Sequence, residues 1–140
     1  MSHPILGGWK LESWTISLNK TVTHPFGEKP VGRILYTADG QMSATIARAD
    51  RPTLSHPVPA KAPGDEKLAA FDSYFSYGGS FRIDGEEVVH RVELSLNPNF
   101  VGSEQRRRMS FDGDTLTLSA DEETPKGKKH HSIRWRRAQN

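Results

Sequence analysis

Cysteine is absent from the 140 residues, which excludes disulfides, thiolate nucleophiles and cysteine metal sites. Long apolar runs are absent too, so no stretch is long enough to cross a bilayer. The amino-terminal residues Met1-Ser2-His3-Pro4 lack the basic region and the apolar region that together mark a secretory signal. We therefore expect a cytoplasmic protein that has no membrane partner.

Several catalytic signatures are also missing. The chain has no glycine-rich phosphate loop, no paired-carboxylate motif and no nucleophile elbow. Its net charge of +2 is too small to imply a nucleic-acid partner. Basic residues cluster at 106–108 and 126–137, but Ile133 and Trp135 alternate with the basic residues of the second cluster, so half of it should be buried. We expect no nucleic-acid partner, no cofactor and a solvated basic outer face.

Short strand patterns joined by tight turns fill most of the chain. Asp39-Gly40, Asp84-Gly85 and Asp112-Gly113 favour tight hairpins, because glycine readily takes the positive φ that such turns need. With 34% hydrophobic and 26% charged residues, we expect one all-β domain over residues 1–140. Eight antiparallel strands can close into a barrel that holds one small ligand. The expected strands cover residues 10–18, 31–37, 42–48, 80–84, 86–96, 105–111, 115–120 and 130–137.

One helix is expected, over residues 65–77. Leu68, Phe71 and Phe75 have the spacing of an amphipathic helix, and Gly78-Gly79 would end it. The preceding residues, 49–63, contain four prolines and predict a long surface loop. We expect the helix to lie across one mouth of the barrel and the loop to border the cavity entrance.

The sequence resembles the bacterial and fungal lipocalin-like domain family along nearly its whole length. The resemblance implies an eight-stranded calycin-type barrel, and some family members look like cyclases or isomerases of small metabolites. The family often has two histidines where this chain has His90-Arg91. The matching stretches are Gly8-Trp9-Lys10-Leu11, Pro25-Phe26-Gly27, residues 30–37, Asp39-Gly40, Tyr77, His90-Arg91-Val92-Glu93, Asn97-Pro98-Asn99, Gly102, Gln105, Arg107, Gly113-Asp114 and Trp135-Arg136.

His90 is the sharpest candidate for a functional residue. Strand alternation places it on the same face as Val88, Val92, Leu94 and Leu96, which otherwise reads as core. An imidazole can accept or donate a proton near neutral pH, so His90 could be a general acid or base. The alternatives are that His90 only lines a cavity, or that it is a satisfied core histidine.

The next strand also carries polar groups on its inward face. Alternation places Gln105, Arg107, Met109 and Phe111 inward. Arg107 could bind a carboxylate, enolate or phosphate through its planar guanidinium, and Gln105 and Met109 would line the same cavity. The alternatives for Arg107 are an internal salt bridge or stacking on an aromatic ring. We expect His90 and Arg107 to face one enclosed cavity.

Other candidates are weaker. Tyr36 and Tyr77 could donate phenolic hydrogen bonds into the cavity or could simply pack in the core. Of the neighbouring His130 and His131, only His131 can face inward, so no metal site is expected. The resemblance also implies that a tryptophan and an arginine close the barrel base by stacking, and the matching residues are Trp9 and Arg136.

These observations favour a barrel that binds a small, largely apolar molecule bearing a polar or anionic group. The same residues fit a cofactor-independent isomerase or cyclase, with His90 as general acid or base and Arg107 stabilising an enolate. They also fit a carrier that only holds its ligand. A third reading is an interaction module with a filled barrel and exposed arginines at 106, 108 and 134. The sequence leaves the oligomeric state open, a homodimer included.

Overall fold

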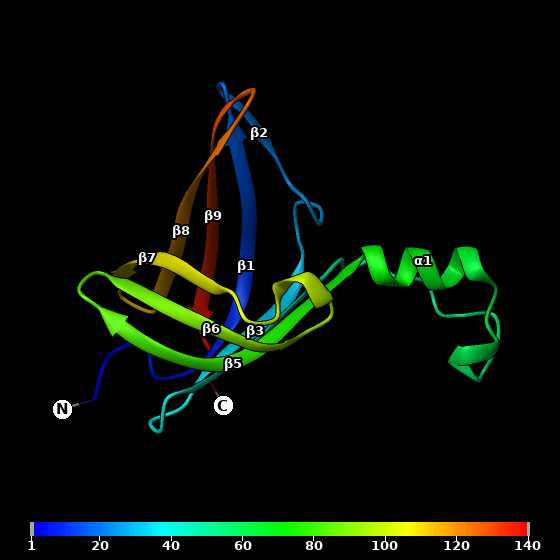
Figure 1. Cartoon of the computed structure of the whole chain (residues 1–140), viewed down its shortest axis with the longest axis horizontal. Coiled ribbons are helices and arrows are strands. Elements are labelled where there is room, and N and C mark those ends of the chain that lie inside the picture. Colours follow the sequence, from blue (N-terminus) through cyan, green and yellow to red (C-terminus); the bar gives the residue numbers. More distant parts are fainter. Residues whose placement is uncertain (1, 140) are drawn as a thin grey trace.

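Residues 2–139 are described by a computed structural model, and they form a closed antiparallel β-barrel (Figure 1). Each long strand pairs with the next long strand in the chain, and the last strand pairs back onto the first. The predicted eight-stranded barrel with one helix is confirmed. The strands are β1 (Gly7–Leu18), β2 (Thr21–Thr23), β3 (Val31–Tyr36), β4 (Gln41–Ala47), β5 (Tyr74–Asp84), β6 (Glu87–Ser95), β7 (Glu104–Asp112), β8 (Thr115–Thr124) and β9 (Gly127–Arg137).

The short strand β2 lies outside the eight that close the barrel, and the sequence analysis missed it. It pairs only with the far end of β1, where Leu18 faces Thr21. The two residues between them, Asn19 and Lys20, both have positive φ, 50° and 68°. Two consecutive positive φ values are the geometry of the tight turn whose twist matches that of a hairpin. Neither residue is glycine, so the usual glycine signal was absent.

A β-bulge in β1 brings two tryptophans to the same side of the sheet. Leu11 pairs with Trp135 and Ser13 pairs with Arg134, so Glu12 is an extra residue on β1. Simple alternation would place Trp9 and Trp14 on opposite faces, but the bulge reverses the phase between them. Trp9 is buried at the base of the barrel, where its indole N–H donates to the carbonyl of Ile5 at 2.9 Å.

A second bulge changes the outer half of the strand that carries His90. Val92 and Leu94 of β6 pair with the consecutive residues Gly79 and Gly78, so Glu93 is an extra residue. Leu94 was predicted to face inward, but it is 66% exposed. Gly79 permits the bulge, because a Cβ at this position would lie 1.9 Å from the carbonyl oxygen of Arg91. His90 precedes the bulge and keeps its predicted phase.

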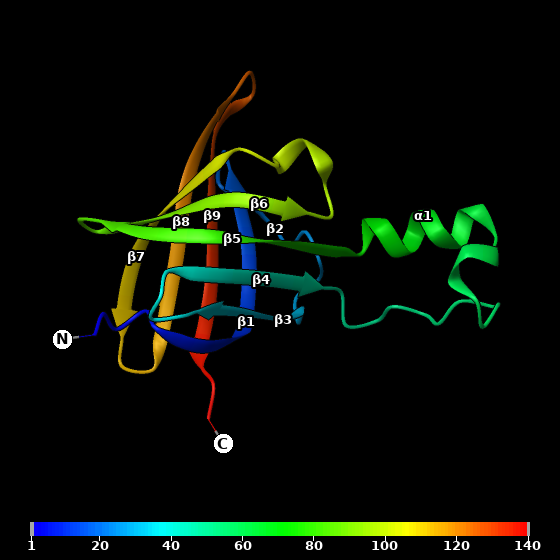
Figure 2. The ribbon, with the colours of Figure 1, turned by 60° about the horizontal axis from the view of Figure 1, so that its bottom comes forward.

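The helix is shorter than predicted, and it does not cross a mouth of the barrel. Helix α1 spans Gly64–Asp72, and Ser73 ends it with a hydroxyl hydrogen bond to the carbonyl of Ala69. From Tyr74 the chain is strand β5, because sheet pairing with β4 overrides the helical spacing of the aromatic residues. Figures 1 and 2 show α1 projecting away from the barrel. Within residues 2–139, no helix has the length and apolar character that a bilayer crossing requires.

The base of the barrel is closed by a different arginine from the one predicted. Trp135 faces the core, so Arg137 shares its face and Arg136 points outward. The guanidinium of Arg137 lies 4.1 Å from the centroid of the Trp9 ring, whereas Arg136 pairs with Glu12 at 2.9 Å. The buried residues Ile34, Val88, Val92 and Leu116 belong to the same core cluster as the two tryptophans.

Candidate functional site

A cavity of about 220 Å³ lies inside the barrel, beside this packed core. Most of its lining side chains are apolar or aromatic, and they come from strands on every side of the barrel and from the short 3₁₀ helix η2 (Pro98–Phe100). No residue of the 49–63 loop lines the cavity, so the prediction that this loop borders the entrance is wrong. The lining residues are Trp14, Ile34, Ala44, Ile46, Phe75, Tyr77, His90, Phe100, Arg107, Leu118, His131, Ile133 and Trp135.

His90 is held between two tyrosines. The Tyr36 hydroxyl lies 2.6 Å from Nε2 of His90, and the Tyr77 hydroxyl lies 2.6 Å from Nδ1. Tyr36 is at the end of β3, where inward residues alternate with exposed ones, and Tyr77 is on β5 opposite the small residue Ala44. His90 is only 1% exposed, so these two hydroxyls satisfy both ring nitrogens of a fully buried imidazole.

The buried imidazole is neutral. Burial, reinforced by the positive charge of Arg107, lowers the pKa of His90 to about 3. Burial also raises the pKa of Tyr77 to about 12 and raises that of Tyr36 well above its usual value. A neutral imidazole has one N–H donor and one acceptor nitrogen. One tyrosine therefore donates to His90, and the other accepts from it and keeps a hydroxyl proton for a different partner.

Arg107 lines the same cavity as His90, as the phase of β7 predicted. Its guanidinium donates to the carbonyl of Arg106 at 2.8 Å and to the side-chain oxygen of Gln105 at 3.4 Å. Within residues 2–139 it takes part in no ion pair and no stacking on an aromatic ring, so neither alternative from the sequence applies. The outward Arg106 and Arg108, in contrast, both pair with carboxylates. Arg107 is therefore a partly buried cation without a counter-charge among the described residues.

Two tryptophans that the sequence analysis did not select also line the cavity. The indole nitrogens of Trp14 and Trp135 are buried, and neither has a hydrogen-bond partner among the described residues. Phe75 and Phe100 complete an aromatic wall beside Tyr77, with ring centroids 5.6 to 5.7 Å apart. Trp14 was missed because only the β1 bulge turns it inward, and that bulge has no local sequence signal.

Of the remaining predicted residues, His131 lines the cavity, whereas Gln105 and Met109 lie outside its lining. Gln105 does not line the cavity; it orients Arg107 and donates to the Ser103 hydroxyl at 2.9 Å. Met109 packs against the core cluster instead of lining the cavity. His131 does line it, and its Nε2 lies 3.0 Å from a carboxylate oxygen of Glu122. No cluster of potential metal ligands occurs in the part of the chain that the structure describes.

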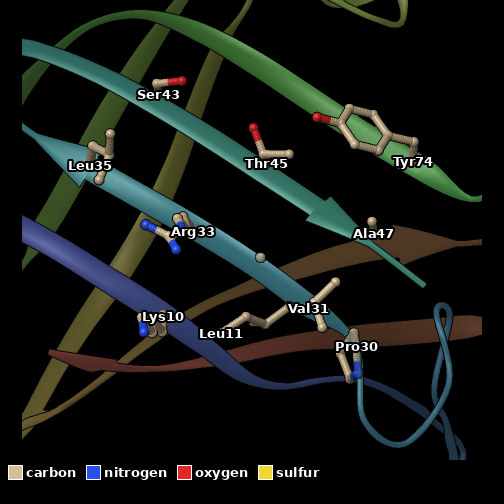
Figure 3. Close-up of a pocket in the computed structure, with 11 residues that line it drawn as sticks. Lys10, Leu11, Pro30, Val31, Arg33, Leu35, Ser43, Thr45, Ala47 and Tyr74 are labelled. Atoms are coloured by element: carbon tan, nitrogen blue, oxygen red, sulfur yellow. The ribbon is translucent and has the colours of Figure 1, made fainter. Parts of the chain in front are cut away.

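A larger but open groove of about 590 Å³ lies on the outer face of the barrel, over β3 and β4 (Figure 3). Its lining includes Val31 and Leu35, which are 52% and 46% exposed, and the cations Lys10 and Arg33. The groove is separate from the cavity, because inward and outward residues alternate along these strands. It contains none of the predicted site residues.

Comparisons with known proteins agree with this architecture. The model of a family described as the lipocalin-like domain matches residues 6–138. The chain is also 30% identical, over 86 residues, to the 4'-hydroxy-3'-methoxypropiophenone carrier protein of Aspergillus oryzae. That match covers 56% of this chain and 78% of the fungal protein.

Proposed function

This chain belongs to the lipocalin-like domain family, and we propose that it is a carrier that holds one small, largely apolar molecule inside its barrel. The observation that carries the proposal is Arg107, a cation that lines an apolar cavity and has no carboxylate partner within residues 2–139. An unpaired, partly desolvated charge is costly, and an anionic or carbonyl oxygen of a ligand would offset that cost. The similarity to a protein named as a carrier supports the same function.

The size of the cavity limits the ligand. An apolar cavity of roughly 150 Å³ can hold benzene, so about 220 Å³ suits a single ring with a few substituents. The aromatic wall of Phe75, Tyr77 and Phe100 offers edge-to-face contacts to such a ring. The molecule in the name of the fungal relative, a propiophenone with one hydroxyl and one methoxy group, is of this kind.

Binding can be measured through the tryptophans of the cavity. Titration with 4'-hydroxy-3'-methoxypropiophenone should quench the emission of Trp14 and Trp135, and calorimetry should give the same affinity. Arg107→Met should weaken binding about tenfold or more, since a hydrogen bond to a charged group contributes about 1.5 to 3 kcal/mol. Arg108→Met is the matched control, because Arg108 faces outward and pairs with Glu86. Failure to bind this compound and a panel of substituted single-ring compounds would refute the proposed carrier function.

A cofactor-independent isomerase or cyclase is the second candidate. The neutral His90, bonded to a tyrosine of the cavity wall, favours it. In the tautomer whose Nδ1 accepts from Tyr77, Tyr77 would pass its hydroxyl proton to His90 while its oxygen takes the α-proton of the ligand, and Arg107 would stabilise the resulting enolate. Incubation with enolisable ketones in deuterated water tests this. Accelerated exchange at the α-carbon that His90→Gln abolishes, with binding retained, would favour an enzyme. Binding without exchange would favour the carrier.

A further inference from the structure

Several of the polar side chains around the cavity are hydrogen-bond donors. An indole N–H can only donate, and those of Trp14 and Trp135 have no partner among the described residues. Trp135 is 1% exposed, so bulk water does not readily satisfy it. The guanidinium of Arg107 is likewise a donor without an acceptor function. Both nitrogens of His90 already have partners, and Nε2 of His131 faces Glu122.

The tyrosine pair adds a fourth donor. If Tyr77 donated to His90, the remaining hydroxyl proton would belong to Tyr36, which is 2% exposed and has, within residues 2–139, only His90 as a hydrogen-bond partner of its hydroxyl. That proton would be buried without an acceptor, which is unfavourable. If Tyr36 donates to Nε2, Nδ1–H donates to Tyr77, and the proton of Tyr77 remains available at the cavity wall. The second arrangement leaves no buried donor of Tyr36, Tyr77 or His90 unpaired once a ligand is bound.

From the donors Arg107 and Tyr77 above all, we infer that the cavity selects an acceptor-rich ring compound, with carbonyl, carboxylate or phenolate oxygens, over an amine of the same shape. The inference rests on the proposed carrier function and specifies its ligand class. Tyr77 contacts the ligand oxygen, and Tyr36 and His90 are positioning residues that orient the Tyr77 hydroxyl. An amine would bring further donors to a cavity in which Nδ1 of His131 is one of few acceptors, and its charge would repel Arg107.

Three probes of nearly equal shape test the ligand class: acetophenone, cumene and α-methylbenzylamine. Acetophenone should bind the wild-type protein about tenfold more tightly than cumene, and the amine should bind most weakly. Tyr77→Phe and Tyr36→Phe should both lower the acetophenone-to-cumene ratio severalfold while cumene binding is unchanged, and the preference that remains is due to Arg107. Tyr74→Phe is the control, because Tyr74 lies in the outer groove and outside the cavity lining.

The outcomes separate the two proposals. If none of the three probes nor any other single-ring compound binds, the carrier function itself is wrong. If cumene binds and acetophenone binds no more tightly than the amine, the carrier function stands and the ligand class is wrong. An effect of Tyr77→Phe without one of Tyr36→Phe would refute the positioning role of Tyr36. Should a tyrosine variant fail to fold, the wild-type ratios alone decide the ligand class.

A separate observation concerns the segment of residues 48–73, here called the arm, which contains η1 (Pro59–Lys61) and α1. The arm projects from the barrel in two views (Figures 1 and 2). Helix α1 has nine residues, none of them buried, and its Leu68 and Phe71 are 62% and 48% exposed. Isolated helices of this length are marginal in water, so stable helices normally pack against something. Among the described residues, α1 contacts mainly β5 and the loop of the arm itself.

The outer groove has features that complement α1. A nine-residue helix is about 14 Å long, and the five residues from Val31 to Leu35 span about the same length. The groove carries Lys10 and Arg33, and α1 carries Asp65 and Asp72; none of the four takes part in an ion pair within the described residues. The groove also exposes apolar side chains that could contact those of the helix.

We propose that α1 of each copy of this chain occupies the outer groove of a second copy, forming a two-fold symmetric dimer. The arm and the groove meet at Ala47 and Tyr74, the last residue of β4 and the first of β5. The arm therefore leaves the barrel at one end of the groove and points away from it, which favours docking onto a partner copy. An interface of this type is reciprocal, since both copies use the same two surfaces.

Sedimentation or light scattering of the full chain across a concentration series tests the dimer. Leu68→Asp on α1 and Leu35→Asp in the groove should each convert the dimer to a monomer, and high salt should weaken it. Leu94→Asp is the control, because Leu94 is at least as exposed as Leu68 and Leu35 but lies on β6. Circular dichroism checks that each variant is folded. A wild-type monomer at high concentration, or a dimer that resists both substitutions, would overturn the proposal.

Discussion

The Tyr77 hydroxyl lies 2.6 Å from Nδ1 of His90, on the neighbouring strand, and pairs with an imidazole whose pKa is lowered by burial inside the barrel. Tyr36 completes the arrangement from the opposite side. Protonation of this imidazole would reverse one of the two hydrogen bonds, because both ring nitrogens would then donate, and would bring a charge near Arg107. The stability of the fold and the chemistry of the cavity are therefore coupled through one residue.

The stability of the protein should fall as the pH falls below about 6.5, because of His90. An unfolded histidine binds a proton near that pH, but the folded pKa of His90 is about 3. Between these values the unfolded state holds more protons, so the free energy of unfolding decreases by about 1.4 kcal/mol per pH unit from this group. Urea unfolding from neutral pH to about pH 5 measures the slope. His90→Gln should flatten it, and an unchanged slope would contradict the assignment.

The two tyrosines should differ in their effect on stability. Tyr36→Phe leaves Nε2 of His90 without a partner in the closed core and should cost about 1 to 3 kcal/mol. Tyr77→Phe should cost less, because water in the cavity can replace its hydroxyl. Thermal and urea unfolding of the ligand-free variants give both values. Equal losses in the free energy of unfolding would mean that Nδ1 of His90 is as isolated from water as Nε2.

Gly79→Ala should be strongly destabilising, because the new Cβ would lie 1.9 Å from the backbone oxygen of Arg91. The strand would have to shift and give up the β6 bulge, at a cost of about 3 kcal/mol or more. Gly64→Ala is the matched control, since a Cβ there meets nothing within 4 Å and alanine favours a helix. Urea unfolding of both variants checks the contrast. A mild effect at position 79 would argue against the bulge.

Arg137→Ala should cost more stability than Arg136→Ala. Arg137 lies over the Trp9 ring and donates to the carbonyls of Leu6 and Pro4, so its loss should cost about 1 to 3 kcal/mol. Arg136 makes an exposed ion pair with Glu12, which should contribute less than about 1 kcal/mol. Thermal unfolding and near-ultraviolet circular dichroism of the tryptophans compare the two. The opposite ranking would restore the role that the sequence predicted for Arg136.

Local patterns predicted much of the barrel and the centre of its site. Two-residue alternation and the Asp-Gly turns indicated most of the strands, because each signal lies within a few residues of the chain. The same alternation correctly predicted that His90 and Arg107 face inward. No bulge separates either residue from the apolar residues on the same face of its strand that were used for the prediction. The identification of the lipocalin-like domain needed only motifs that can be read along the chain.

Tertiary structure decided the rest, because bulges and strand pairs join residues far apart in the sequence. Glu12 and Glu93 can be recognised as extra residues only from the pairing of their strands with β9 and β5. These two bulges set the orientation of Trp14 and Leu94. Residues 74–77 have a helical spacing of aromatic side chains, but pairing with β4 makes them strand and brings the Tyr77 hydroxyl to His90. Periodicity gives the direction of one side chain, whereas a triad of two tyrosines and a histidine requires three strands in register.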